Sequence, residues 1–185
     1  MIPQFALRFP KSEVLHWAKR YSFATDTEVV GIGERSRLAG FYTRGDFLVV
    51  CKWKTRGRPR RHYERNSDED VRLQTGIALT SADEETRILS LIALHGVSWP
   101  TASVFLHLAH KEPYPILDFR ALWSLQCERR YYTFEFWRSY VQACRALAVD
   151  CGVSIRDLDR ALWEYSSANQ PPKTKSGGRC LKKRA

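Results

Sequence analysis

Apolar residues recur at helical spacing along most of this chain, and alternating strand-like runs are rare. The clearest example follows Thr133, where Trp137, Tyr140, Val141 and Cys144 lie one, three or four residues apart. This spacing gathers the apolar side chains into a stripe along one face of an α-helix. The pattern predicts an all-α fold.

Start and stop signals divide this pattern into successive helices. Ser, Thr or Asp three residues before an acidic residue is typical of a helix start, and glycine commonly follows a last turn. Residues 47–51 form an unbroken apolar run that a strand would also explain, but the pair Thr43 and Asp46 favours a helix. The predicted helices cover residues 12–20, 26–38, 43–54, 67–79, 81–94, 133–151 and 154–165, and Pro100 opens one more.

The composition is that of a folded domain with an extension. Hydrophobic residues make up 44% of the 185 residues, enough for a core. We predict one compact helical domain over residues 1–169 and a disordered tail over 170–185, which carries six basic residues and no acidic one. The chain has no apolar run of membrane-spanning length and no signal-peptide pattern, so we expect a cytoplasmic, nucleoid-associated protein that does not enter a membrane.

The positive charge is concentrated in one segment. The chain has a net charge of +10, and residues 52–65 hold seven Lys or Arg against one Glu, with aromatic residues between them. Basic side chains reach phosphates and aromatic faces stack on bases, so we expect this basic segment (residues 52–65) to contact DNA, although a solvated loop would have the same composition. The predicted DNA-binding residues here are Lys52, Trp53, Lys54, Arg56, Arg58, Arg60 and Arg61.

Residues 94–121 carry the most informative motif. They read as a helix end, a turn containing Gly96, a helix opened by Pro100, and then Asp118 before a further helix. A turn that presents backbone N–H groups at a helix start attracts phosphate. We therefore expect DNA contacts here as well, although an ordinary helix–helix turn is the alternative. The predicted contacts are Gly96, Val97, Ser98 and Thr101 in the turn, and Arg120 after Asp118.

This stretch resembles the helix-hairpin-helix DNA glycosylases, and most of all their adenine glycosylase branch. There a hairpin of the form L-P-G-V-G-x-x-T-A leads to P-I-L-D, which residues 115–118 match letter for letter. Ser98 replaces the usual second glycine. The resemblance implies a compact helical bundle with a helix-hairpin-helix motif, and the remaining chain is similar to small bacterial proteins that share this hairpin.

The resemblance assigns the catalytic role to Asp118. In these glycosylases the matching aspartate lies near the sugar of an extruded nucleotide. Breaking an N-glycosidic bond builds positive charge on the sugar, which a fixed carboxylate stabilises. An aspartate before a helix is also a common N-cap, and the two roles are compatible because a cap points its carboxylate outward.

Two further positions define the expected chemistry. Pro100 stands where bifunctional members of the family carry a nucleophilic lysine, so the resemblance implies hydrolysis by water without strand cleavage. If the protein did cleave the strand, Lys52 or Lys54 would have to supply the nucleophilic amine in place of that lysine. The adenine glycosylases also use a glutamate on an early helix to protonate the leaving base, and no residue here aligns with it.

Cysteine and histidine spacing argues against a metal cofactor. The cysteines form no C-x-x-C pair, so neither a zinc site nor the iron–sulfur cluster of many related glycosylases is expected. His107 and His110 are three apart on a predicted helix without a third ligand in sight. We expect no cofactor.

Three functions remain open from the sequence. The first is a monofunctional enzyme that binds double-stranded DNA and hydrolyses the N-glycosidic bond of an extruded base. The second is a DNA-binding module that has kept the hairpin without catalysis. The third is a basic protein that contacts RNA or a protein partner. No motif in the sequence identifies the base that would be removed or the oligomeric state.

Overall fold

The computed structural model describes residues 4–22, 26–55, 60–127 and 131–171, and every regular element in these ranges is a helix. The predicted all-α fold is confirmed. The α-helices are α1 (Val14–Arg20), α2 (Asp26–Ala39), α3 (Arg44–Thr55), α4 (Asp68–Thr80), α5 (Glu84–Ile92), α6 (Trp99–Ala109), α7 (Phe119–Ser124), α8 (Phe134–Asp150) and α9 (Ile155–Asn169). Two 3₁₀ helices, η1 (Lys11–Glu13) and η2 (Arg60–Arg65), precede α1 and α4.

Most helix starts predicted from the sequence are confirmed by side-chain caps. Ser67 forms a capping box before α4, and Thr133 and Ser154 accept from the third residue of α8 and α9. The predicted caps of two other helices are wrong. Ser12 lies inside η1, which has no side-chain cap. The cap of α5 is Asp83 and not a residue at 81, because the Asp83 carboxylate accepts from the N–H of the third helical residue at 2.8 Å.

The ambiguous run at residues 47–51 is helical. Phe47, Val50 and Cys51 are fully buried and lie three and four residues apart, so a helix directs all three into the core. The Thr43 hydroxyl accepts from the N–H of Asp46 at 3.2 Å, as the cap-like pair predicted.

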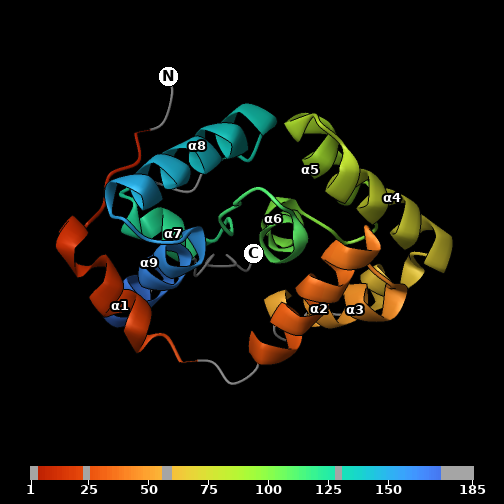
Figure 1. Cartoon of the computed structure of the whole chain (residues 1–185), viewed down its shortest axis with the longest axis horizontal. Helices are drawn as coiled ribbons and strands as arrows, with labels where there is room; N and C mark the ends of the chain where they lie inside the picture. Colours follow the sequence, from red (N-terminus) through yellow and green to blue (C-terminus); the bar gives the residue numbers. More distant parts are fainter. Residues whose placement is uncertain (1–3, 23–25, 56–59, 128–130, 172–185) are drawn as a thin grey trace, which may run out of the picture.

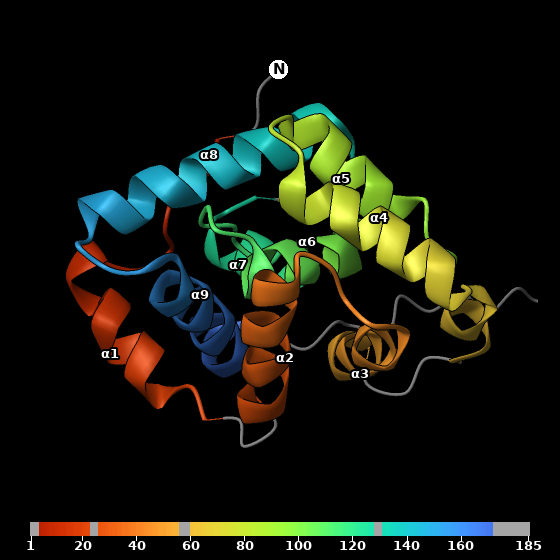
Figure 2. The ribbon, with the colours of Figure 1, turned by 45° about the vertical axis from the view of Figure 1, so that its right-hand side comes forward.

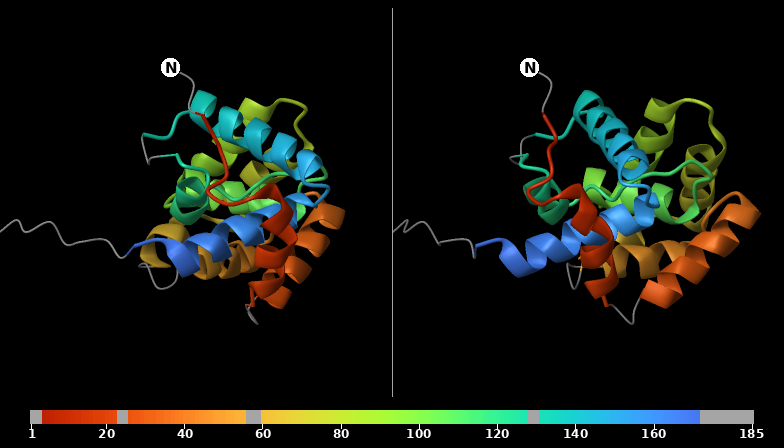
Figure 3. Two further views of the ribbon diagram at one scale, coloured as in Figure 1. Left: turned by 90° about the vertical axis from the view of Figure 1, so that its left-hand side faces the viewer. Right: turned by 60° about the vertical axis from the view of Figure 1, so that its left-hand side comes forward.

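α6 forms the centre of the molecule. Its residues Thr101–Leu106 are all buried, as expected of a helix without a polar face. In Figure 1, α2 to α5 lie on one side of α6, and α1, α7, α8 and α9 lie on the other. After rotation, α3, α4 and α5 still lie on one side of α6, and α1, α7 and α9 on the other (Figure 2). α1 crosses and packs on α9, so the first and last described helices belong to the same half (Figure 3).

A short turn at residues 93–98 joins α5 to α6. The N–H of Val97 donates to Leu94 at 3.1 Å, and the N–H groups of Thr101 and Ala102 donate to Ser98 at 2.8 Å. Gly96 has a φ of +83°, and a Cβ there would lie 3.0 Å from the Tyr63 ring. From the sequence, this glycine is expected in a turn that contacts DNA. The structure gives an internal reason for the glycine, since left-handed backbone and contact with η2 both exclude a side chain.

We expect Gly96→Ala to lower the free energy of unfolding by about 2 kcal/mol, because a left-handed conformation costs an L-residue roughly 1–2 kcal/mol and the added methyl group meets Tyr63. Urea unfolding followed by circular dichroism measures this loss. Gly31→Ala is the matched control. Gly31 lies within α2 with open space around it, so alanine should stabilise the protein by about 0.5–1 kcal/mol. Equal effects at both positions would contradict the strained turn.

Candidate functional site

Hydrogen bonds from three helices hold the segment that leads to Asp118. Ile116 donates its N–H to Asp159 of α9 at 3.0 Å, and its carbonyl accepts from the hydroxyl of Tyr140 in α8 at 2.8 Å. Leu117 donates its N–H to the Ser103 hydroxyl of α6 at 2.8 Å. The backbone before Asp118 is therefore fixed against α6, α8 and α9.

Asp118 is the N-cap of α7, and it also forms an ion pair. Its Oδ1 accepts from the N–H of Arg120 at 2.9 Å, which confirms the predicted cap. Its Oδ2 lies 2.8 Å from Nζ of Lys54, with 19% and 12% of the two side chains exposed. The carboxylate therefore does not point freely outward, and Lys54 neutralises it from α3.

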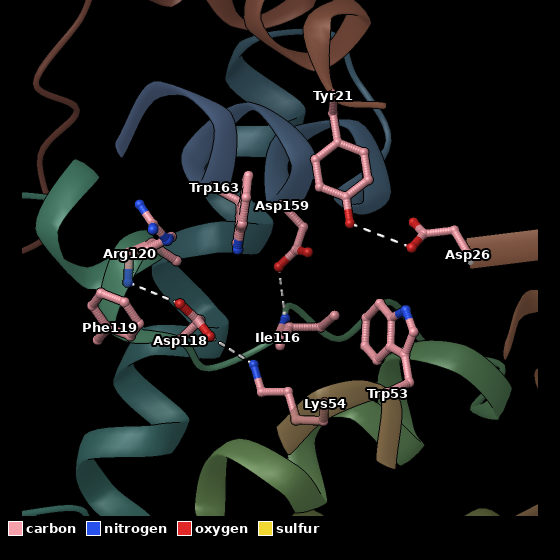
Figure 4. Close-up of a pocket in the computed structure, with 11 residues that line it drawn as sticks. Tyr21, Asp26, Trp53, Lys54, Ile116, Asp118, Phe119, Arg120, Asp159 and Trp163 are labelled. Carbon is pink, nitrogen blue, oxygen red and sulfur yellow. Dashed lines mark hydrogen bonds and ion pairs between the residues drawn. The ribbon is translucent and has the colours of Figure 1, made fainter. Parts of the chain in front are cut away.

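The Asp118 carboxylate belongs to a pocket of about 250 Å³ between the two halves of the molecule (Figure 4). This volume is below the roughly 300–1,000 Å³ of pockets for drug-sized ligands, so the pocket suits a ligand of one or two rings. Trp53 of α3 and Trp163 of α9 flank it from different sides (Figure 4). The lining residues are Tyr21, Asp26, Trp53, Lys54, Ile116, Asp118, Phe119, Arg120, Ala121, Asp159 and Trp163.

Asp159 is a second carboxyl group in this pocket, and the sequence interpretation missed it. Burial is the main reason that its pKa is raised to about 7, and the nearby charge of Asp118 adds to the shift. The hydrogen bond from the N–H of Ile116 and the charges of Lys54 and Arg156 lower the pKa of Asp159, but they do not cancel the increase. A carboxyl group in a pocket whose pKa is near neutrality is a candidate for proton transfer.

We expect Asp159 to make the free energy of unfolding pH-dependent. Its folded pKa lies above the ordinary value near 4, so the folded state binds more protons than the unfolded chain between about pH 4 and pH 7. The native protein should therefore lose stability relative to Asp159→Asn as the pH rises through this window. Urea unfolding at pH 5 and pH 8 should show the difference shifting by about 2–3 kcal/mol in favour of the variant. A difference independent of pH would contradict the raised pKa.

The structure brings several predicted DNA-binding residues to this pocket. Trp53 and Lys54 line it from α3, and Arg120 lies over the Trp163 ring with its guanidinium carbon 4.9 Å from the centroid. Lys52 is exposed and does not line the pocket. Trp53, Lys54, Asp118 and Arg120 therefore lie together although they come from distant parts of the chain.

The basic segment and the α5–α6 turn also lie side by side. The buried Asn66 side chain, just after η2, accepts from the N–H of His95 at 2.7 Å and donates to its carbonyl at 3.1 Å. Gly96 and Ser98 are exposed in the turn, as is Arg61 in η2. The two segments predicted to bind DNA thus share one region of the surface.

Other predicted contacts are buried or undescribed. Val97 and Thr101 are buried, and both use their N–H groups within the turn, so they support it from inside. Ser98 occupies the cap position of α6 without a side-chain cap, and the helix begins at Trp99. Arg56, Arg58, the Arg60 side chain and residues 172–185 of the basic tail lie outside the described part of the protein.

The pocket contains no arrangement typical of a metal site. Across the described ranges, no three His, Cys, Asp or Glu side chains converge to hold a metal ion. His107 contacts the carbonyl of Tyr114 at 2.7 Å and the Arg156 guanidinium at 3.0 Å. Burial and the Arg156 charge lower the pKa of His107 to about 3, so its ring is neutral at physiological pH.

Comparisons with family models, curated proteins and solved structures give no match for this chain. Among the described helices, none has the length and apolar character needed to cross a membrane. Function is therefore inferred from the residues of the pocket and from the surface beside it.

Proposed function

We propose that this protein binds double-stranded DNA, extrudes one nucleotide and hydrolyses its N-glycosidic bond with the help of Asp118. The observation that carries the proposal is the location of Asp118, which lies in an aromatic-walled pocket and not on an open surface. A helix cap alone does not require such surroundings. Aromatic walls beside a carboxylate suit a base that stacks while its sugar becomes cationic.

The neighbouring surface supports a nucleic-acid substrate. Lys54 links the pocket to the basic segment, and Asn66 links that segment to the α5–α6 turn. In the proposal, the turn is the hairpin that holds the DNA backbone, and a phosphate of the extruded nucleotide competes with Asp118 for the Lys54 ammonium group. Asp118 then faces the sugar with its charge available.

Water is the nucleophile in this proposal. Lys54 is the lysine nearest to Asp118 in the pocket, but its ammonium group donates a hydrogen bond to that carboxylate, and a protonated amine has no lone pair for attack. Base removal should therefore leave an intact strand with an abasic site. Borohydride should trap no covalent complex between the protein and DNA. A trapped complex that is lost in Lys54→Arg would show that the Lys54 amine, and not water, attacks the sugar.

The experiment that tests the function uses the full chain and a set of labelled DNA duplexes, each with one modified or mispaired base. Heating in alkali after incubation converts abasic sites to strand breaks. The proposal predicts breaks at one kind of site only, and only after alkali. No breaks with any duplex would refute it.

A non-catalytic DNA-binding module is the second candidate. It is favoured by the ion pair itself, since Lys54 cancels the charge that catalysis needs in the free protein. This module would bind every duplex with salt-dependent affinity and release no base. The alkali experiment therefore separates the two functions.

A further inference from the structure

We infer that Asp159 is the general acid of the proposed reaction, that it delivers a proton to a ring nitrogen of the departing base, and that the substrate therefore carries an uncharged base. The inference rests on the proposed function, because it assigns a role within the same pocket. It adds a catalytic residue from α9 and narrows the class of substrate.

The geometry places the Asp159 carboxyl group where a base would lie. It lines the pocket between Trp163 and Tyr21, and it points toward the segment that holds Asp118 (Figure 4). Its Oδ1 is occupied by the N–H of Ile116, which fixes the rotamer. In the part of the chain that the structure describes, no ion pair involves Asp159, and none of these residues holds its Oδ2 as a cationic partner.

The charges around Asp159 favour a neutral ligand. Lys54 neutralises Asp118 at 2.8 Å, and Arg156 neutralises Asp26 at 2.9 Å. The raised pKa of Asp159 leaves its carboxyl group substantially protonated at neutral pH. Before DNA binds, the pocket therefore has no excess negative charge to attract a cationic base, and Arg120 opposes one. The Asp118 charge that becomes available when a phosphate draws Lys54 away faces the sugar and not the base. The charged and titratable groups that interact electrostatically with the Asp159 carboxyl group are Lys54, Arg156, Asp118, Tyr21, Tyr140 and Cys144.

The reaction balances with water as the only co-reactant. As the bond between C1′ and the base nitrogen breaks, its electron pair leaves with the base. The Asp159 proton moves to a ring nitrogen, so the base departs neutral. Water adds to C1′ on the cationic sugar, and the proton that it loses restores the acid form of Asp159. An N7-alkylated purine is already cationic and leaves as a neutral molecule without this proton.

The test compares the native protein with Asp159→Asn on four DNA duplexes. Three contain a neutral base (uracil, hypoxanthine, or adenine opposite 8-oxoguanine), and one contains 7-methylguanine. Asn keeps an acceptor for the Ile116 N–H, and melting followed by circular dichroism checks folding. Asp157→Asn is the matched control, because it removes a carboxylate from the same helix at a position that does not line the pocket.

We expect the native protein to release at least one neutral base, with a rate that falls above about pH 7. Asp159→Asn should lower that rate by roughly a hundredfold or more, within the range of about 10²–10⁴ for general acid catalysis, and should abolish the fall above pH 7. Asp157→Asn should retain the native rate. Any release of 7-methylguanine should change less than fivefold in Asp159→Asn.

The results that would contradict the acid role of Asp159 differ from those that would contradict the proposed function. Undiminished release of a neutral base by folded Asp159→Asn would remove the acid role while leaving the glycosylase function in place. Release of 7-methylguanine alone would refute the substrate class. A native protein that releases none of the four bases and no other base in the wider duplex set would refute the proposed function, and the inference with it.

Discussion

Asp118→Asn should reduce base release by roughly a hundredfold or more while leaving DNA binding intact. The substitution keeps the oxygen that accepts from the Arg120 N–H, but it removes the charge that would stabilise a cationic sugar. Losing one electrostatic group at a reacting centre typically costs about 10²–10³ in rate. Single-turnover release from the duplex that the native protein cleaves measures this loss, and an electrophoretic shift measures binding.

The same substitution has a stability cost that the cap alone does not predict. Lys54 would remain in the pocket without its counter-ion. Exposed ion pairs contribute about 0–1 kcal/mol, whereas breaking a buried pair costs about 3–5 kcal/mol. The Asp118–Lys54 pair is intermediate, with 19% and 12% of its side chains exposed, so we expect a loss of about 1–3 kcal/mol. Assays are therefore run well below the melting temperature of the variant.

Asp83→Asn is the matched control for this experiment. Asp83 is also an aspartate N-cap, accepting from the Thr86 N–H at 2.8 Å, but it caps α5 and does not line the pocket. It should keep native activity. If Asp118→Asn releases bases as fast as Asp83→Asn, Asp118 is only a helix cap, and the catalytic part of the proposal fails.

The sequence predicts helices well because each one carries its own local signals. Ser67 with Asp70, Thr133 and Ser154 cap helices through contacts within four residues, which a linear pattern records. α5 is the instructive exception. Ser81 and Glu84 have the spacing of a capping pair, but Asp83 competes for the same helix start and its carboxylate is the stronger acceptor.

The pocket could be predicted only in part, because its walls come from both ends of the chain. Asp118 and the basic segment are recognisable from motif and composition. Tyr21, Asp159 and Trp163 become pocket residues only when α1 and α9 pack together. Asp159 did leave a signal, because it is four residues after Ile155 and three before Leu162 and thus borders the apolar stripe of α9. A carboxylate at that position has to be partly buried.

The basic surface should account for most of the DNA affinity. Lys52 and Arg61 are exposed on α3 and η2, the elements next to the pocket and the α5–α6 turn. If each neutralises one phosphate, replacing both by Ala should reduce the slope of log K against log salt by about 2. At 50–100 mM salt the affinity should fall roughly a hundredfold, because each lost contact removes about one unit of log K in that range. Fluorescence anisotropy with a labelled duplex, repeated from 50 to 300 mM salt, measures both quantities.

Arg37→Ala with Lys111→Ala is the control for net charge. These two exposed residues border a cavity near the C-terminal end of α6, whereas the α5–α6 turn lies at its N-terminal end, about 16 Å away along an eleven-residue helix. The control pair removes the same two charges, so a general effect of net charge would weaken DNA binding equally in both variants. We expect the slope of the control to stay within about 0.5 of the native value, and its affinity for DNA to fall by about threefold at most. Equal losses in the two pairs would mean that DNA does not lie along α3 and η2, and Lys54 would then have no phosphate to draw it away from Asp118.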